Sequence, residues 1–112
     1  MNVFTWLLVG HLAGDFLLQT GWMAKKVFNT TSLLVHCFVY TMTIFIMALP
    51  AGGLSVTALS VIFISHFILD QRNFVNFWVR RVNNAENLQW MNIAVDQSFH
   101  LLVLAIVSGY LN

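Results

Sequence analysis

The chain has 112 residues, enough for one domain; 59 % of them are hydrophobic and only 8 % are charged. Soluble domains carry about a quarter charged residues, so this chain has too few charges to cover a soluble surface and must bury its surface in lipid or against other subunits. The net charge of +1 and the lack of a basic tract argue against nucleic-acid binding.

Four apolar stretches are long enough to be membrane spans, since a span needs about 20 mostly apolar residues. They cover residues 3–20, 32–49, 54–71 and 92–111 of a single transmembrane domain, 1–112. The break between the second and third contains Pro50, Gly52 and Gly53, a short turn that predicts an antiparallel hairpin. We therefore expect an all-α integral membrane four-helix bundle.

The basic residues predict the orientation of this bundle. They all fall in the first and third links, on one side of the membrane: Lys25, Lys26, Arg72, Arg80 and Arg81. The positive-inside rule places that side in the cytoplasm, so both termini are expected on the non-cytoplasmic side.

The third link, about residues 73–91, begins with an amphipathic stretch. Within 73–82, Phe74, Phe77, Trp78 and Val82 share one helical face. This pattern predicts a short helix lying on the cytoplasmic interface. The alternative is that the third helix continues past the membrane.

Histidine and aspartate recur at a spacing of four inside the apolar stretches. The pairs are His11 with Asp15, His66 with Asp70, and Asp96 with His100, while the fourth histidine, His36, has Tyr40 at the same spacing. Residues i and i+4 share one helical face, so each pair projects to one place.

The antiparallel topology brings these polar residues to similar depths. Counted from the cytoplasmic ends, they lie about one to two turns deep, or roughly 6 to 14 Å at 1.5 Å per residue. A charge inside the bilayer costs several kcal/mol, so these side chains are expected to face the bundle interior and to have partners there.

Three explanations compete for this group. The first is a metal site, because imidazole and carboxylate bind divalent metals, with zinc favoured here over manganese or iron. Paired ligands on facing helices build such sites in bundles. The ligand candidates are His11, Asp15, His36, His66, Asp70, Asp96 and His100. The second explanation is a proton or ion pathway, and the third is hydrogen bonding that holds the helices together.

Further residues accompany this group. Gln71 and Gln97 directly follow Asp70 and Asp96, and we expect them to orient ligands or to line a headgroup entrance. Gly10 and Gly14 predict a close helix crossing beside His11. The chain has a single cysteine, Cys37, which excludes an internal disulfide. We interpret Cys37 as a small buried hydrophobic residue rather than as a metal ligand.

The motifs HLAGD at 11–15 and HFILD at 66–70 have the same pattern. They suggest a degenerate two-helix repeat about an axis normal to the membrane. The alternative is coincidence in an apolar sequence of low diversity.

The ordered motifs HLAGDFLLQTGWMAKKV, HCFVY, SHFILDQR and DQSFHLLVLAIV resemble a family of small four-helix bacterial and phage integral membrane proteins of unknown function. This resemblance covers nearly the whole chain and implies a multi-pass protein of the bacterial cytoplasmic membrane. A weaker similarity, in motif style alone, is to predicted membrane-bound metal-dependent hydrolases.

Three functions remain open. In a membrane-embedded metal-dependent hydrolase, Asp15, Asp70 or Asp96 would serve in catalysis and the substrate would be a lipid-linked molecule or a headgroup. In a proton or metal-ion channel or transporter, the same residues would line the pathway. In a phage or host membrane interaction protein, they would be structural. A homo-oligomer is expected in each case, because four short helices bury a thin core.

Overall fold

The fold is entirely helical over the residues that the computed structural model describes, 2–23 and 29–111. The α-helices are α1 (Val3–Leu12), α2 (Thr30–Ala48), α3 (Val56–Asp70), α4 (Asn73–Arg81) and α5 (Gln89–Ile106). Three shorter segments extend them: the π-helical turns η1 (Ala13–Leu17) and η4 (Val107–Leu111), and the 3-10 turn η3 (Leu49–Ala51). The all-α prediction is confirmed for these residues.

Polar side chains cap the N-terminal ends of α1, α2 and α3. The Asn2 side chain accepts a hydrogen bond from the Thr5 amide, the Asn29 side chain accepts from the Thr31 amide, and the Ser55 hydroxyl accepts from the Ala58 amide. Each cap satisfies a backbone donor that has no partner inside its own helix. The helix starts are thus encoded locally.

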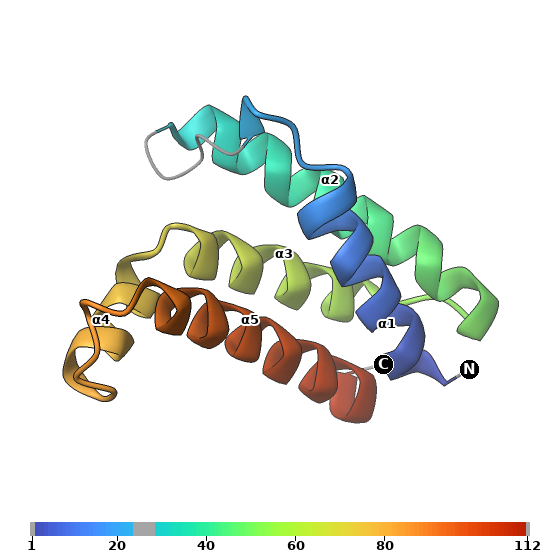
Figure 1. Cartoon of the computed structure of the whole chain (residues 1–112). Helices are drawn as coiled ribbons and strands as arrows, with labels where there is room; N and C mark the ends of the chain where they lie inside the picture. Colours follow the sequence, from blue (N-terminus) through green and yellow to red (C-terminus); the bar gives the residue numbers. More distant parts are fainter. Residues whose placement is uncertain (1, 24–28, 112) are drawn as a thin grey trace.

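Helices α1 and α2 cross at close range, as the glycine pair predicted. A Cβ atom built on Gly10 would lie 3.0 Å from the Ile44 Cα atom, and one on Gly14 would lie 3.2 Å from the Tyr40 Cα atom. Both distances are tighter than ordinary packing, so only glycine lets the two backbones approach this closely. Figure 1 shows α1 lying across α2.

The turn between α2 and α3 forms the expected hairpin. Gly52 and Gly53 have φ values of 104° and 82°, a left-handed conformation that glycine adopts without a steric penalty. Helices α3 and α5 then lie alongside each other, with α4 at one end of the bundle. Both termini lie at the opposite end, together with the α2–α3 turn (Figure 1).

Helix α4 is separate from α3, so residues 73–82 do not continue the third helix, while their placement on the cytoplasmic interface stays a prediction. Arg72 has a φ of 73° and ends α3. The side chains that α4 buries are Val75 and Val79, four residues apart, and Trp78 packs its ring 5.0 Å from that of Phe99 in α5.

An apolar core fills the end of the bundle nearest the termini. Its fully packed members come from α1, α2, α3, α5 and η4: Leu7, Tyr40, Ile44, Ala48, Ala58, Ile62, Leu104 and Val107. A smaller cluster under α4 contains Leu69, Val75, Val79 and Val95. The polar site lies between these two apolar regions.

Two helical segments are long and apolar enough to cross a membrane by length and composition, Thr30–Ala51 with 22 residues and Gln89–Leu111 with 23. Val3–Leu17 and Val56–Asp70 are apolar but shorter. The four-span arrangement and its orientation therefore stay predictions. Lys25 and Lys26, on which the orientation partly depends, lie outside the described residues.

Candidate metal centre

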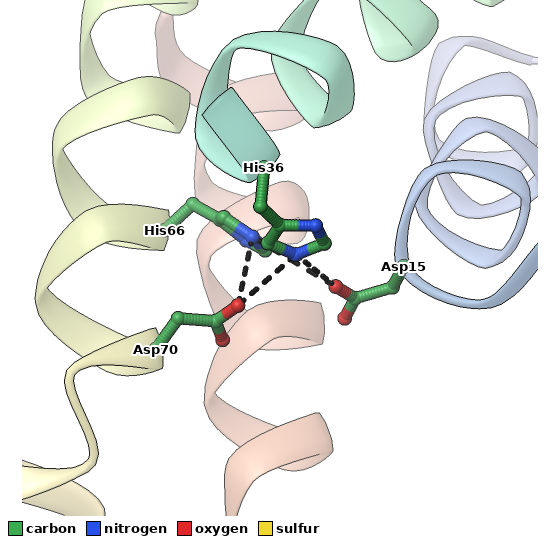
Figure 2. A group of neighbouring side chains, drawn as sticks. All are labelled: Asp15, His36, His66 and Asp70. Carbon is green, nitrogen blue, oxygen red and sulfur yellow. Dashed lines mark hydrogen bonds and ion pairs between the residues drawn. The ribbon is translucent and has the colours of Figure 1, made fainter. Parts of the chain in front are cut away.

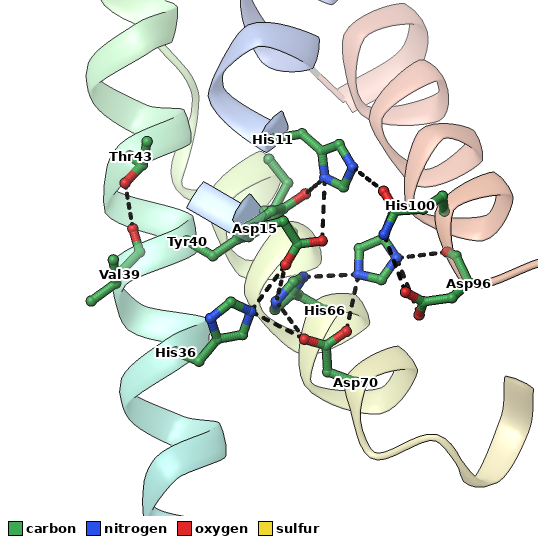
Figure 3. A network of polar contacts seen from close by, with 12 residues as sticks. His11, Asp15, His36, Val39, Tyr40, Thr43, His66, Asp70, Asp96 and His100 are labelled. Carbon is green, nitrogen blue, oxygen red and sulfur yellow. Dashed lines mark hydrogen bonds and ion pairs between the residues drawn. The ribbon is translucent and has the colours of Figure 1, made fainter. Parts of the chain in front are cut away.

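The structure brings the seven polar residues singled out in the sequence into one buried network (Figure 3). His11 lies in α1, Asp15 in η1, His36 in α2, His66 and Asp70 in α3, and Asp96 and His100 in α5. None of these residues is more than 6 % exposed. Four helices that are far apart in sequence thus direct imidazole and carboxylate groups into one interior.

A change in helical geometry aims Asp15 at this interior. Helix α1 ends at Leu12 and continues as the π-helical turn Ala13–Leu17, which widens the backbone where Asp15 lies. Such turns inside α-helices occur frequently at functional sites. Because Gly14 lets α1 lie against Tyr40 of α2, the adjacent carboxylate reaches the histidine of that helix.

Asp15, His36, His66 and Asp70 form the most compact group (Figure 2). The His36 Nε2 atom lies 3.0 Å from Asp15 Oδ1 and 3.1 Å from Asp70 Oδ2. The His66 Nε2 atom lies 3.1 Å from Asp70 Oδ2 and 3.8 Å from Asp15 Oδ1. One nitrogen or oxygen atom from each residue lies within 4.8 Å of all the others, which is close enough to hold a metal ion.

These separations match a tetrahedral site. Zinc binds nitrogen and oxygen at about 2.0–2.2 Å, so neighbouring ligand atoms of a regular tetrahedron lie about 3.3–3.6 Å apart. The four nitrogen–oxygen separations between the histidines and the aspartates, from 3.0 to 3.8 Å, lie around that value. Two carboxylates with two neutral imidazoles carry a charge of −2, which one divalent cation neutralises. The residues present therefore fit a divalent metal.

A chain of histidine contacts favours the same arrangement. The His100 Nδ1–H group donates to the backbone carbonyl of Asp96 at 2.7 Å, and the His100 Nε2 atom lies 3.0 Å from His66 Nδ1. With both rings neutral, His66 Nδ1–H donates to His100, and His66 Nε2 presents a lone pair to the carboxylate oxygen of Asp70. A proton or a metal ion between these two atoms makes the contact favourable, and a second contact of this kind commonly orients metal-binding histidines.

A second group shares Asp70 with the first. It consists of Asp70, Asp96 and His100, whose candidate ligand atoms also lie within 4.8 Å of one another. The Oδ2 atom of Asp70 faces His36 and His66, whereas its Oδ1 atom lies 3.4 Å from His100 Nε2. On the outer side of this group, Asp96 Oδ2 is 3.9 Å from Arg72 Nη2. Asp70 therefore connects the two groups.

His11 lies beside these groups and makes different contacts. Its Nδ1 atom is 2.8 Å from the Tyr40 hydroxyl, its Nε2 atom is 2.8 Å from Gln97 Oε1, and Asp15 Oδ2 is 3.9 Å away. The expectation that Gln97 orients a ligand candidate agrees with this contact. Whether His11 binds a metal itself stays a prediction.

Tyr40 is the member of the network that sequence reasoning gave no role. Its ring stacks on His66, with centroids 3.8 Å apart and planes 13° apart, and its hydroxyl contacts His11. The signal for it was its spacing of four from His36. Cys37, beside His36, is buried and belongs to neither group, in line with its interpretation as a small hydrophobe.

A family model described as a protein family of unknown function, DUF3307, matches residues 3–112. The chain belongs to this family. The match covers nearly the whole chain and confirms the expected membership in a family of unknown function. No curated protein and no solved structure matches the chain. The similarity to membrane-bound metal-dependent hydrolases stays a prediction.

Proposed function

We propose that this member of the DUF3307 family is a bacterial cytoplasmic-membrane protein of four spans, which binds a divalent metal inside the membrane and uses it for hydrolysis. The distribution of side chains supports the membrane placement. The network of histidines and aspartates is buried, while large apolar side chains are exposed along all four long helices, including Leu12, Leu17, Phe38, Ile46, Val56, Ile64, Ile93 and Leu102. A polar interior beneath an apolar surface suits lipid as the surroundings.

Helix lengths are compatible with this placement. The segments Thr30–Ala51 and Gln89–Leu111 extend about 33 Å and 34 Å at 1.5 Å per residue, enough for a hydrocarbon core of about 30 Å. The two shorter segments extend about 22 Å. A short span is accommodated by local thinning of the bilayer or by its flanking residues.

The observation that carries the metal proposal is the group of Asp15, His36, His66 and Asp70. Two buried carboxylates so close together require two compensating positive charges, and burial of uncompensated charge is costly. A divalent cation supplies both at once, with ligand separations near the tetrahedral values. Zinc is the favoured ion, with manganese or iron as alternatives.

The position of the polar site favours an enzyme over a channel. On the side of the termini, the interior continues as the apolar core of Leu7, Ile44 and Leu104, which offers no polar path. On the side of α4, Asp96 approaches Arg72 at the protein surface. A polar site that is bounded by an apolar core toward the termini suits a reaction on a headgroup at the expected cytoplasmic side better than conduction across the membrane.

A metal held by these four residues would need a further coordination position for water, whose pKa it would lower so that the water supplies a nucleophile for hydrolysis. The protein would hold that ion with the four-residue group, and Asp96 would accept a proton as the general base, because it lies in the second group next to the surface. Asp15 and Asp70 would serve in catalysis through metal binding. A homo-oligomer is part of this proposal, since the exposed apolar faces could also pack against a second copy.

Metal content tests this proposal. The protein is purified in mild detergent without chelator or histidine tag, and its metals are measured by mass spectrometry. We expect one or two equivalents of zinc, manganese or iron in the unaltered protein and in the control Ser98→Ala, whose exposed hydroxyl bonds only its own helix. His66→Ala should lose the metal. Full metal content in a His66→Ala, His100→Ala protein would refute the ligand assignment.

A further inference from the structure

We propose that the cleft between α4, the segment that follows it and the start of α5 binds the phosphodiester headgroup of a glycerophospholipid. The cleft has a volume of about 560 Å³, and Arg72, Asn76, Glu86, Gln89 and Asn92 are among its lining residues. This inference deepens the proposed function and rests on its membrane placement, because it names the substrate class of the same site.

Arg72 is the centre of this cleft. Its side chain is one quarter exposed, and its guanidinium has five N–H donors, of which Nη1 donates to Asn92 Oδ1 at 3.0 Å. Guanidinium groups bind phosphate oxygens in a planar, two-point geometry. Arg72 therefore offers the cation that a phosphate requires.

The backbone at Arg72 gives an independent reason to assign it a function. Its amide donates to the Leu69 carbonyl at 3.1 Å and its φ is 73°, so it occupies the left-handed position that follows a helix C-terminus. Glycine is the residue that usually takes this position, because it has no Cβ atom to strain. An arginine at this position places a charged side chain there at the cost of backbone strain. Strained backbone conformations of this kind cluster at functional sites.

The amides around Arg72 are ordered so that they present donors. Asn92 accepts from Arg72 and its Nδ2 atom donates to Asn76 Oδ1 at 2.8 Å. In this series of hydrogen bonds, each side-chain amide oxygen accepts from a protein donor. The series ends on Asn76, whose own amide nitrogen can only donate. The donors gathered at Arg72 therefore favour an anion at this point of the cleft.

The charge of the lining restricts which phosphate fits. Glu86 also lines the cleft, and its carboxylate repels a second negative charge. A phosphodiester carries one negative charge, which Arg72 balances, whereas a phosphate monoester carries up to two. The lining therefore favours a diester headgroup over phosphatidic acid.

The surroundings of the cleft point to a lipid as the carrier of the phosphate. Two of its lining residues are exposed apolar side chains, Leu88 at 39 % and Ile93 at 55 %. These side chains would meet acyl chains while Arg72 meets the headgroup. Since Arg72 Nη2 lies 3.9 Å from Asp96 Oδ2, a bound headgroup would lie beside the candidate metal centre.

Native mass spectrometry of the delipidated full-length protein tests this inference, with four short-chain probes. Dioctanoyl phosphatidylglycerol should bind, while dioctanoyl glycerol, which lacks the phosphate, and inorganic phosphate, which lacks the acyl chains, should bind at least about ten-fold more weakly. Dioctanoyl phosphatidic acid should also bind more weakly. Equal binding of dioctanoyl glycerol, of inorganic phosphate or of phosphatidic acid would overturn the assignment to a lipid phosphodiester.

Arginine variants locate the binding. Arg72→Gln should reduce the affinity for phosphatidylglycerol about ten-fold or more, the effect of losing charge-assisted hydrogen bonds. The matched control is Arg81→Gln, which removes the same charge from the exposed end of α4, where no contact with the cleft is found. Arg72→Gly suits the left-handed backbone and is expected to fold, so it provides the second variant. Unchanged phosphatidylglycerol binding in both Arg72 variants would overturn the proposal.

Metal measured on the same samples separates the two proposals. We expect both Arg72 variants to keep the metal content of the unaltered protein while their binding of phosphatidylglycerol is reduced. A protein without metal that still binds phosphatidylglycerol through Arg72 would refute the metal proposal and support the cleft. A protein that contains metal and binds phosphatidylglycerol equally well without Arg72 would support the metal proposal and refute the cleft inference.

Discussion

At the scale of single residues, the site depends on atoms that serve two neighbours at once. Asp70 directs Oδ2 at His36 and His66 and Oδ1 at His100, so it links two candidate groups. His66 likewise directs Nε2 at the carboxylates and Nδ1 at His100. Removing either residue therefore affects both groups, whereas removing an outer residue affects one.

Asp96→Asn tests this difference between shared and outer residues. Asp96 contacts His100 and Arg72 and lies outside the four-residue group. We expect the variant to keep at least one equivalent of metal, while Asp70→Asn loses all of it. Metal analysis of the two matched variants checks this expectation, and loss of all metal from Asp96→Asn would contradict it.

Tyr40→Phe separates the two contacts of Tyr40. The variant keeps the ring that stacks on His66 and removes the hydroxyl that contacts His11. We expect the metal to be retained and the free energy of unfolding to fall by about 0.6 kcal/mol, the average for hydrogen bonds between membrane helices. Thermal unfolding and metal analysis test it, and loss of the metal would show that the hydroxyl has a more direct role.

At the scale of helices, the close crossing of α1 and α2 positions half of the four-residue group. Gly10 and Gly14 let the helices approach, and the π-helical turn of η1 carries Asp15 toward His36 of α2. Helix α3 supplies the other half from a single face. The separation of α1 and α2 therefore controls whether the carboxylate of Asp15 reaches its partners.

Gly10→Ala is expected to push α1 away from α2. The added Cβ atom would lie 3.0 Å from the Ile44 backbone, which cannot move as a flexible side chain could. We expect a loss of about 1–3 kcal/mol in unfolding free energy, typical of overpacking. The matched control is Gly109→Ala, where no atom lies within 4 Å of the added Cβ. Equal stability of the two variants in chemical denaturation would argue against the close crossing.

The helices and their antiparallel order could be predicted from the apolar runs and from the turn at Gly52 and Gly53. The convergence of histidine and aspartate followed from their spacing of four and their common depth. Spacing fixes which residues share a face, but it does not fix how each helix is rotated toward its neighbours. The roles of Tyr40, the π-helical turn and the left-handed Arg72 therefore appear only in the folded chain.

At the scale of the whole molecule, the histidines and aspartates are buried beside an apolar core, while many other large apolar side chains are exposed. The two ends of the bundle also differ. One end holds both termini and the α2–α3 turn, and the other holds α4 with its arginines (Figure 1). This division agrees with the predicted orientation, in which the end with α4 faces the cytoplasm.

Cysteine labelling tests the orientation and the number of spans together. In a Cys37→Ala background, Pro50→Cys marks the α2–α3 turn and Asn83→Cys marks the segment after α4, and both positions are exposed. We expect a membrane-impermeant maleimide to reach Asn83→Cys only from the cytoplasmic side and Pro50→Cys only from the opposite side. Labelling of both positions from the same side would contradict the four-span arrangement.

The most direct test of the central claim is X-ray absorption spectroscopy of the zinc-loaded protein, because it reports the ligand atoms around the metal. We predict an ordered zinc site with four or five nitrogen and oxygen neighbours at about 2.0–2.2 Å, from Asp15, His36, His66 and Asp70 and, where there is a fifth, from water. The same spectrum should disappear in Asp70→Asn. A sulfur neighbour at about 2.3 Å, which would implicate Cys37, or the failure of the protein to bind stoichiometric zinc would contradict the account.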